Sequence, residues 1–336
     1  MKKRIATLIA LSVILVAISA TPLSAVDVHV SAGIDSDYDL DQNDARNWLF
    51  LGGGLDSSWV LSRVLFLDSN AHLRIDYLTP DEVKTATAAM LTGMTFRRDR
   101  YFARVAVDTI GRITDDGSDD FFLADLSTRF EYGSIRYSLF VEPGVEREWG
   151  DNAMIGRRIK GGFSRVLGDR AVGEIAALAG DDRDDLRKQW YYGARTELEW
   201  YPALPRPVAF RVEAGVERYR SDDELVFSGE GVPFWSYNQY QMSLGSSIRS
   251  SSQTRLTLGV PLTMRVYDHN ALQEDDTLSG ETQWSLQMEP RARFSVRPFD
   301  DRLELSARFG ADLTRSNSPI LEQNFLVGGI SVYYAF

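Results

Sequence analysis

The segment "QWYYGARTELEWYPA" (residues 189–203) alternates two kinds of side chain along most of its length. One set of alternate positions carries Trp190, Tyr192, Ala194, Thr196, Leu198 and Trp200, and the other carries Tyr191, Gly193, Arg195, Glu197 and Glu199. Strands of soluble proteins average about 5–6 residues, whereas strands that cross a membrane need about 9–11 residues with alternating faces. This segment therefore predicts a membrane-crossing β-strand.

The two tryptophans of this segment lie on the same face, near its two ends. At about 3.3 Å per residue and a tilt of about 40°, Trp190 and Trp200 are separated by roughly 25 Å, the height of the apolar band between two aromatic girdles. The core of a soluble protein gives no reason for this spacing. We therefore expect both residues to belong to the aromatic girdles of a transmembrane barrel.

The same period of two recurs in residues 208–217, 254–266 and 303–314, and helical periodicity is almost absent after residue 25. Longer and shorter connections alternate between such segments, as in outer-membrane barrels. The longer ones are residues 35–46, 79–84, 114–120, 148–153, 180–188, 220–233, 268–280 and 314–324, and the shorter ones are residues 67–70, 97–100, 131–134, 167–170, 201–207, 250–253 and 297–302. This pattern predicts an all-β fold, a closed antiparallel transmembrane β-barrel of about 16 strands with both ends on the side of the short turns. About 14 strands is the alternative, because alternation is weak in residues 47–80 and 153–180.

The first 25 residues differ from the rest. "MKKR" is cationic, residues 5–20 carry no charge, and small residues precede the end of "TPLSA". This is the pattern of a cleaved secretory signal peptide, and the apolar run is shorter than the roughly 20 residues that a spanning helix needs. We expect residues 1–25 to be the signal peptide, with cleavage after Ala25 or alternatively after Ala20, and residues 26–336 to form a single barrel domain. The chain has no cysteine, which excludes a lipid-anchored form and disulfides.

The formal net charge of -11 argues against a nucleic-acid partner, which would require a basic face. Acidic residues gather in the longer connections, whereas several short turns carry arginine. The acidic set is Asp35, Asp37, Asp39, Asp41, Asp44, Asp115, Asp116, Asp119, Asp120, Asp181, Asp182, Asp184, Asp185, Glu274, Asp275 and Asp276, and the turn arginines are Arg97, Arg98, Arg100, Arg170, Arg206, Arg297 and Arg302. We expect one rim, the extracellular one, to be acidic and solvated.

The polar face of the predicted strands carries both signs of charge in nearly equal number. A midplane arginine that faced lipid would cost about 2–4 kcal/mol, so this face should line a lumen. The predicted lumen residues are Arg104, Asp108, Asp125, Arg129, Glu131, Arg136, Glu142, Arg195, Glu197, Glu199, Arg211, Glu213, Arg255, Arg265, Glu289, Arg291, Arg293, Glu304, Arg308 and Asp312. They either border an aqueous pore or pair with one another and fill the barrel.

The segment "FLVGGISVYYAF" (residues 325–336) resembles the C-terminal strand of bacterial outer-membrane β-barrel proteins, which typically finish in an aromatic residue with apolar residues at alternate positions before it. Here Phe336, Tyr334, Val332 and Ile330 occupy those positions. The resemblance implies an outer-membrane location, lipid as a partner and a strand that the barrel-assembly machinery recognises. We expect this strand to pair on both edges, because an open edge in lipid leaves backbone groups without hydrogen bonds.

No catalytic motif is present, so we expect no enzyme and no cofactor. His269, next to Asn270, has no serine partner in a defensible register. Asp37, Asp39 and Asp41 begin like an EF-hand loop, but Gln42 and Trp48 stand where that loop needs Gly and Glu, so no metal site is predicted. The three glycines of residues 52–54 are interpreted as a bend, a bulge or a close approach by a neighbouring side chain.

The sequence thus favours a porin-like channel for passive diffusion of small polar solutes. The alternatives are an export or secretion barrel for larger cargo and a closed structural or adhesin barrel that presents acidic loops. Within the apolar loop of residues 225–235, Phe227, Val232 and Phe234 are candidates for a partial gate. No sequence feature indicates an oligomeric state.

Overall fold

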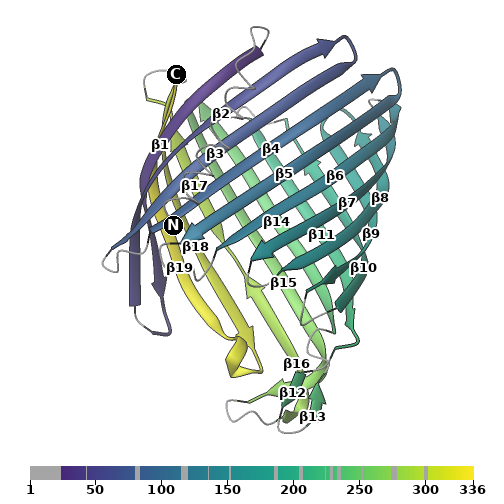
Figure 1. Cartoon of the computed structure of the whole chain (residues 1–336), viewed down its shortest axis with the longest axis vertical. Helices are drawn as coiled ribbons and strands as arrows, with labels where there is room; N and C mark the ends of the chain where they lie inside the picture. Colours follow the sequence, from purple (N-terminus) through teal and green to yellow (C-terminus); the bar gives the residue numbers. More distant parts are fainter. Residues whose placement is uncertain are drawn as a thin grey trace.

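The computed structural model describes residues 24–42, 44–79, 84–114, 120–134, 136–150, 153–184, 188–203, 207–223, 225–227, 230–232, 236–251, 253–273, 278–298 and 302–336. They form one closed antiparallel β-barrel, in which each long strand pairs with its neighbours in the chain (Figure 1). The predicted signal peptide lies almost wholly outside the described residues and stays a prediction.

The barrel has 16 strands, as the sequence predicted. The sheet contains 17 paired segments, of which β16 and β17 are two parts of one strand interrupted at Glu289 and Pro290. The strands are β1 (Ser24–Asp39), β2 (Asp44–Ser62), β3 (Leu65–Thr79), β4 (Lys84–Arg98), β5 (Tyr101–Thr114), β6 (Phe121–Ser134), β7 (Tyr137–Gly150), β8 (Met154–Leu167), β9 (Ala171–Arg183), β10 (Lys188–Trp200), β11 (Val208–Ser221), β14 (Tyr237–Ser251), β15 (Thr254–Leu272), β16 (Leu278–Met288), β17 (Arg291–Val296), β18 (Leu303–Ser316) and β19 (Gln323–Ala335). Two short strands, β12 (Leu225–Phe227) and β13 (Glu230–Val232), form a separate hairpin between β11 and β14.

The barrel closes where β19 pairs with β1. The register runs from His29 opposite Ala335 to Asp39 opposite Phe325, and β19 pairs with β18 on its other edge. The Phe336 N–H donates to the Val28 carbonyl at 2.8 Å. The predicted pairing of the last strand on both edges is therefore confirmed, and the start of β1 lies beside the end of β19 at the turn end.

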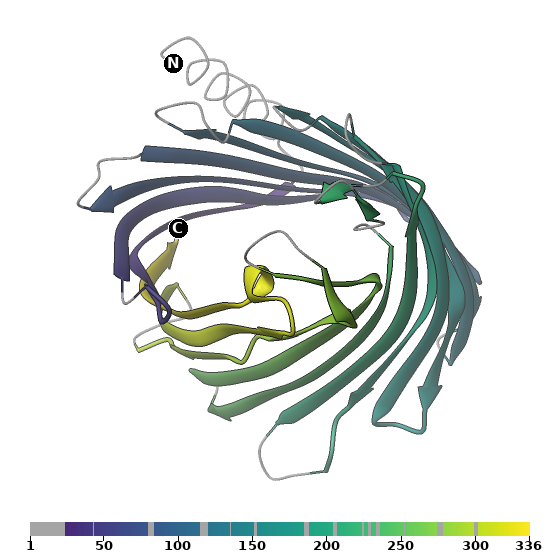
Figure 2. The ribbon, with the colours of Figure 1, turned by 90° about the horizontal axis from the view of Figure 1, so that it is seen from below.

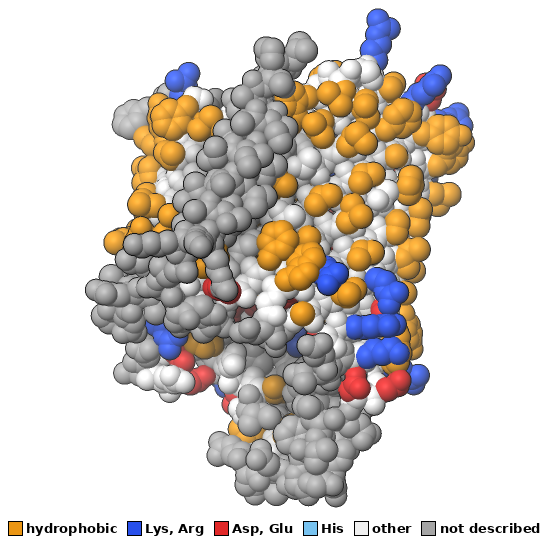
Figure 3. All heavy atoms as spheres, viewed as in Figure 1, with side chains coloured by type: hydrophobic (Ala, Val, Ile, Leu, Met, Phe, Trp, Pro, Cys, Tyr) orange, Lys and Arg blue, Asp and Glu red, His pale blue; other side chains and the backbone are white. Residues whose placement is uncertain are grey.

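The outer face of the barrel is apolar. Hydrophobic side chains cover much of this face above the loops in Figure 3. Ile330 and Phe336 are each 67% exposed, and Ile175 is 65% exposed. Soluble proteins seldom expose contiguous apolar patches larger than a few hundred Å², so this wall requires apolar surroundings. Among the described residues, no helix has the length and apolar character needed to cross a membrane.

Several boundaries predicted from the sequence were wrong. Asp35, Asp37 and Asp39 lie in β1 rather than in a loop, and Asp181 and Asp182 lie in β9. The reason is that β1 and β9 remain hydrogen-bonded to their neighbours beyond the apolar section of the wall. In that outer section, polar side chains are compatible with either face of the strand. Asp41 and Asp184 do lie in connections and Asp44 begins β2, whereas Asp115, Asp116, Asp119, Asp185, Arg206, Glu274, Asp275 and Asp276 lie outside the described residues.

The short turns predicted at residues 67–70 and 131–134 were also wrong. Residues 131–134 belong to β6 and pair with β7. The turn between β2 and β3 lies at residues 63–64, and residues 67–70 belong to β3, where they pair with both β2 and β4. Asp68 and Asn70 share the polar face of the sheet, whereas Ser69 lies on the other face, where its hydroxyl is 3.1 Å from that of Thr92. Polar residues that signal a turn in a soluble protein are compatible with a strand whose inner face is polar.

The loop between β18 and β19 contains the 3₁₀ helix η1 (Pro319–Leu321), which lies within the ring of strands when the barrel is seen from below (Figure 2). It is anchored to the extended hairpin of β15 and β16, because the Ser318 hydroxyl donates to the Leu272 carbonyl at 2.7 Å. Ser318 and Gln283 are 0% exposed and Leu272 is 1% exposed. The side chains of the predicted gate, Phe227, Val232 and Phe234, lie outside the described part.

The closing seam is expected to tolerate a methyl group at Gly328 but not at Gly329. A Cβ on Gly329 would overlap Asp35 Oδ1 and lie 3.0 Å from the Ile34 carbonyl oxygen, whereas a Cβ on Gly328 would meet only the Arg308 carbonyl oxygen at 3.7 Å. Gly329→Ala should lower the free energy of unfolding by about 1–3 kcal/mol. The Gly328→Ala control should change it by less than about 0.5 kcal/mol. Urea titration of the heat-modifiable gel band measures both, and equal losses would contradict the steric explanation.

Candidate functional site: the charged face of the barrel

Cross-strand register brings most of the predicted lumen residues onto one face of the sheet, here called the charged face. Arg104 lies opposite Arg129, Glu197 opposite Glu213, and Arg308 opposite both Arg293 and Gly329. Residues that lie opposite one another in a sheet share a face. The charged face therefore continues around the wall, and its members contact one another in local clusters.

The first cluster, the seam cluster, spans the closing strands. Asp35 is 2% exposed and accepts from Arg74 Nη2 at 2.7 Å and from Arg308 Nη2 at 2.6 Å. Arg74 comes from β3 and Arg308 from β18, so this one carboxylate links strands on both sides of the seam. Arg74 also contacts Asp76 at 2.6 Å and lies 4.1 Å above the Phe50 ring. Glycine at position 329 leaves the space in which Arg308 and Asp35 meet.

A second cluster joins β6, β7, β8 and β9. Arg129 lies 3.4 Å from Glu142 and 3.7 Å from Glu174, and Lys160 lies 2.7 Å from Glu174. The Arg129 guanidinium stacks 4.0 Å above the Phe140 ring. Two cations thus share carboxylates over one aromatic ring, which fixes their positions against the wall.

Two further arginines contact carboxylates of neighbouring strands. Arg158 on β8 reaches over β7 to Asp125 on β6 and also lies 3.6 Å from Glu146. Glu217 is 1% exposed, lies 2.5 Å from Arg195 Nη2 and accepts a hydrogen bond from the Tyr219 hydroxyl at 2.6 Å. The buried Glu217 carboxylate therefore has both a cation and a hydroxyl donor, as a buried charge requires.

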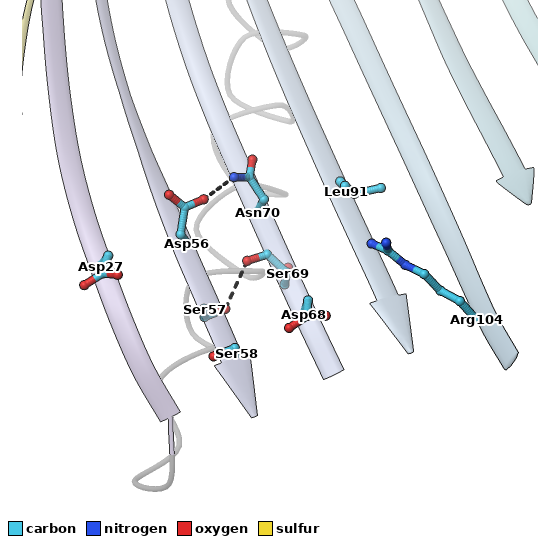
Figure 4. A pocket seen from close by; sticks show the side chains of 9 residues that line it. All are labelled: Asp27, Asp56, Ser57, Ser58, Asp68, Ser69, Asn70, Leu91 and Arg104. Carbon is cyan, nitrogen blue, oxygen red and sulfur yellow. Dashed lines mark hydrogen bonds between the residues drawn. The ribbon is translucent and has the colours of Figure 1, made fainter. Parts of the chain in front are cut away.

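A pocket of about 230 Å³ lies between β1 and β5 and is lined by Asp27, Asp56, Asp68, Asn70 and Arg104 among others (Figure 4). Asn70 donates to Asp56, as the dashed line in Figure 4 marks. The pocket is acidic on one side, and the Arg104 Nε has no hydrogen-bond partner among the described residues. The Arg104 guanidinium nevertheless packs against Gly93: a Cβ added at position 93 would lie 3.1 Å from the guanidinium nitrogens.

Next to this pocket the side chains of His29 and His72 meet over Gly54. His29 Nε2 and His72 Nδ1 are 3.1 Å apart, and a Cβ on Gly54 would lie 2.6 Å from His29 Nε2. Pairing of β2 continues through residues 52–54 without a register shift, so close approach by neighbouring side chains explains the glycine at position 54. Among the described residues, no group of three or more His, Asp or Glu side chains is arranged to hold a metal ion.

Most predicted lumen residues in our list make side-chain contacts in the structure. Those in ion pairs or hydrogen bonds include Arg129, Arg195, Glu197, Glu199, Arg211, Glu213, Arg255, Arg265, Glu289, Arg291, Arg293, Glu304, Arg308 and Asp312. Glu199 accepts from the Tyr201 hydroxyl in the following turn at 2.5 Å, which raises the pKa of that phenol. Arg136 differs, because it lies exposed in the turn between β6 and β7.

Several central members were not predicted from the sequence. Arg74 and Asp35 fell in a segment with the wrong boundaries, and Arg158, Lys160 and Glu174 fell where alternation is weak. Only the register between neighbouring strands shows that these residues lie on the charged face, and the sequence of a single strand does not contain that register. His269 lies in β15, buried, with its Nδ1 2.8 Å from the Asn270 carbonyl oxygen.

The remaining predicted residues lie on the other face. Trp200 is 49% exposed and stacks on Phe210 at 5.7 Å, and Trp190 lies at the loop end of the same strand. Ile330, Val332 and Tyr334 alternate along the outer side of β19, and Phe336 follows its last residue. The Tyr334 and Phe336 rings meet edge to face at 5.0 Å.

No protein-family model and no curated protein matches the sequence. Solved structures match almost the whole chain. OpdQ of Pseudomonas aeruginosa matches with a TM-score of 0.56 and 9% identity over 94% of this chain and 99% of its own. OccK3 (OpdO) of the same organism matches with a TM-score of 0.54 and 12% identity over 93% and 95%. CdiB from Acinetobacter baumannii matches with a TM-score of 0.52 and 10% identity over 92% of this chain and 60% of its own.

These matches show the fold. The chain has the fold of an outer-membrane β-barrel and is structurally like porins and OprD-family channels. At identities of 12% and below, the likeness concerns the fold alone.

Loss of the Asp35 charge should remove the ion pairs that join Arg74 and Arg308 to Asp35. Asp35→Asn leaves two guanidiniums without their shared carboxylate, so the free energy of unfolding should fall by about 2–3 kcal/mol. Asp68→Asn makes the same chemical change at an exposed position of the charged face and should cost less than about 0.5 kcal/mol. Urea midpoints of the refolded barrels compare the two, and a loss for Asp35→Asn no larger than the control would refute the role assigned to Asp35.

Proposed function

We propose that the protein is a porin-like channel of the bacterial outer membrane, through which small polar solutes diffuse passively. The observation that carries the proposal is the division of a closed 16-strand barrel into an apolar outer wall and a charged face. Barrels of about 16–18 strands are wide enough to hold an aqueous channel. In lipid the charged face can only line the lumen, because charge on the lipid face costs about 2–4 kcal/mol at the midplane.

The geometry of the ion pairs favours an open lumen over a filled one. All ion pairs among the described residues join strands no more than three apart in the sheet order; the widest is Arg129 on β6 with Glu174 on β9. Within the part of the chain that the structure describes, these pairs run along the wall and do not join opposite walls. A closed structural barrel, in which the same charges would form ion pairs across the lumen, is therefore the weaker proposal.

The charged wall would select solutes by size and polarity. Arg195, Lys160 and Arg211 alternate with Glu174, Glu197 and Glu213 around one recess of about 450 Å³. Because the two signs are interleaved, selectivity for ion charge should be mild. The loop that carries η1 would narrow the entrance from the loop side.

Location and assembly belong to the same proposal. We infer export through a cleaved signal peptide of residues 1–25, with loops outside the cell and turns in the periplasm. The outward side chains of Ile330, Val332, Tyr334 and Phe336 would form the signal that the assembly machinery recognises. An export barrel for larger cargo is the alternative function.

Refolded protein in a planar bilayer should conduct ions in discrete, voltage-tolerant steps, because a wide polar lumen is continuous with water. Single-channel recording measures this. Silence from a folded, heat-modifiable barrel would overturn the channel proposal and leave the closed structural barrel as the better reading.

Cysteine substitution can test which face lines the lumen, since the chain has no cysteine. Ser243→Cys on the charged face should be modified by a charged, water-soluble thiol reagent, and modification should reduce the conductance. Leu244→Cys on the neighbouring outward position, where leucine is 43% exposed, should be protected by lipid. Mass spectrometry counts the adducts, and faster labelling at position 244 than at 243 would invert the assignment of faces.

A further inference from the structure

The outer wall of the barrel carries a group of cations on strands β7 to β11. Arg147, Arg157, Arg183, Lys188 and Arg220 alternate with outward apolar positions and are all exposed. We name these five residues the basic belt. In Figure 3, Lys and Arg side chains gather on the right-hand flank, between the hydrophobic wall above and the loops below.

Register places the belt in two adjacent rows. Arg157 lies opposite Asp181, Asp181 opposite Trp190, and Trp190 opposite Arg220. In the next row toward the loops, Ile155 lies opposite Arg147 and Arg183, and Arg183 opposite Lys188. Within the described strands of these two rows, Asp181 is the one carboxylate, and just beyond the end of β11 the Asp223 carboxylate accepts from the Lys188 backbone N–H at 2.5 Å. Five cations therefore face these two carboxylates, which leaves an excess of positive charge.

Contacts with the wall hold the cations in place. Asp181 Oδ2 accepts from Arg157 at 3.0 Å and from Arg183 at 2.9 Å. Lys188 Nζ lies 4.7 Å from the Trp190 ring centre, and the Arg147 guanidinium lies 4.9 Å from that of Trp149. Arg218, also on β11, differs from the belt because Asp268 binds its guanidinium through both oxygens. The belt therefore presents positioned cations that are only partly neutralised.

The position of the belt identifies its partner. Apolar outward residues adjoin it on the side away from the loops: Ile159 is 51% exposed, Tyr192 is 57% exposed and Val216 is 47% exposed. On a wall that faces lipid, the level next to the apolar band with tryptophans beside it is the headgroup level. Clustered cations at this level attract anionic lipid headgroups.

We propose that the basic belt binds the phosphate groups of anionic lipids in the leaflet on the loop side of the membrane. The proposal rests on the membrane-spanning barrel of the proposed function. Two rows of cations on neighbouring strands match a lipid with more than one phosphate. Such a site would tie the barrel to phosphorylated lipid along one flank and fix its depth in the membrane.

The test uses the full barrel in detergent and a diphosphorylated glycolipid, lipid A, as the probe. The belt variant carries Arg157→Gln, Arg183→Gln, Lys188→Gln and Arg220→Gln. The control variant removes the same number of outward or turn charges at the opposite end: Arg63→Gln, Arg98→Gln, Arg165→Gln and Arg170→Gln. Heat modifiability verifies that both variants fold.

Native mass spectrometry should find lipid A bound about tenfold more weakly to the belt variant than to the parent, with the control variant unchanged. The parent should also bind monophosphoryl lipid A more weakly than the diphosphorylated form. Equal binding by parent and belt variant, or an equal loss in the control, would overturn the proposal. Displacement of lipid A by inorganic phosphate would also overturn it, because the belt would then be a free-anion site.

Bilayer recording on the same proteins separates this proposal from the channel. Conductance without belt-dependent lipid binding overturns the belt alone. Belt-dependent lipid binding by a barrel that does not conduct supports the belt and overturns the channel alone.

Discussion

Backbone hydrogen bonding between β1 and β19 is the constraint on which the rest of the structure depends. A strand in lipid has no water to satisfy its N–H and C=O groups, so a sheet that crosses the membrane must have no open edge. Here the first and last strands pair from His29 to Asp39, and the seam cluster of Asp35, Arg74 and Arg308 adds side-chain contacts over the same strands. Closure turns one long meander into a wall with an inside and an outside.

Closure also decides how charge is distributed. Because side chains alternate along every strand, each strand contributes to both the apolar and the charged face. On the charged face, residues of like charge often lie opposite one another, and a nearby residue of the other sign compensates them. Asp125 lies opposite Asp108 across β5 and β6, and Arg158 from β8 forms an ion pair with it. Carboxylates such as Glu217 can therefore be buried in the wall without leaving an isolated charge.

The sequence predicted the strands best where apolar and polar residues alternate strictly. Residues 189–200, including Trp190 and Trp200, lie in β10, and the predicted strand count of 16 is confirmed. Prediction failed at residues 35–39 and 67–70, where Asp, Ser and Asn were interpreted as loop residues. Asp and Asn are depleted in the strands of soluble proteins, but they fit a strand with a polar inner face.

The sequence by itself determined the class of fold, the approximate number of strands and the alternation of faces, because a period of two survives in any register. Only the tertiary structure decided which charges meet. Asp35 and Arg308 are far apart in the chain, and their 2.6 Å contact exists only because closure brings β18, β19 and β1 side by side. The basic belt has the same origin, since cross-strand register aligns single cations from five neighbouring strands into two rows. Pairing between strands is a property of the closed sheet, and a single strand's residues do not encode it.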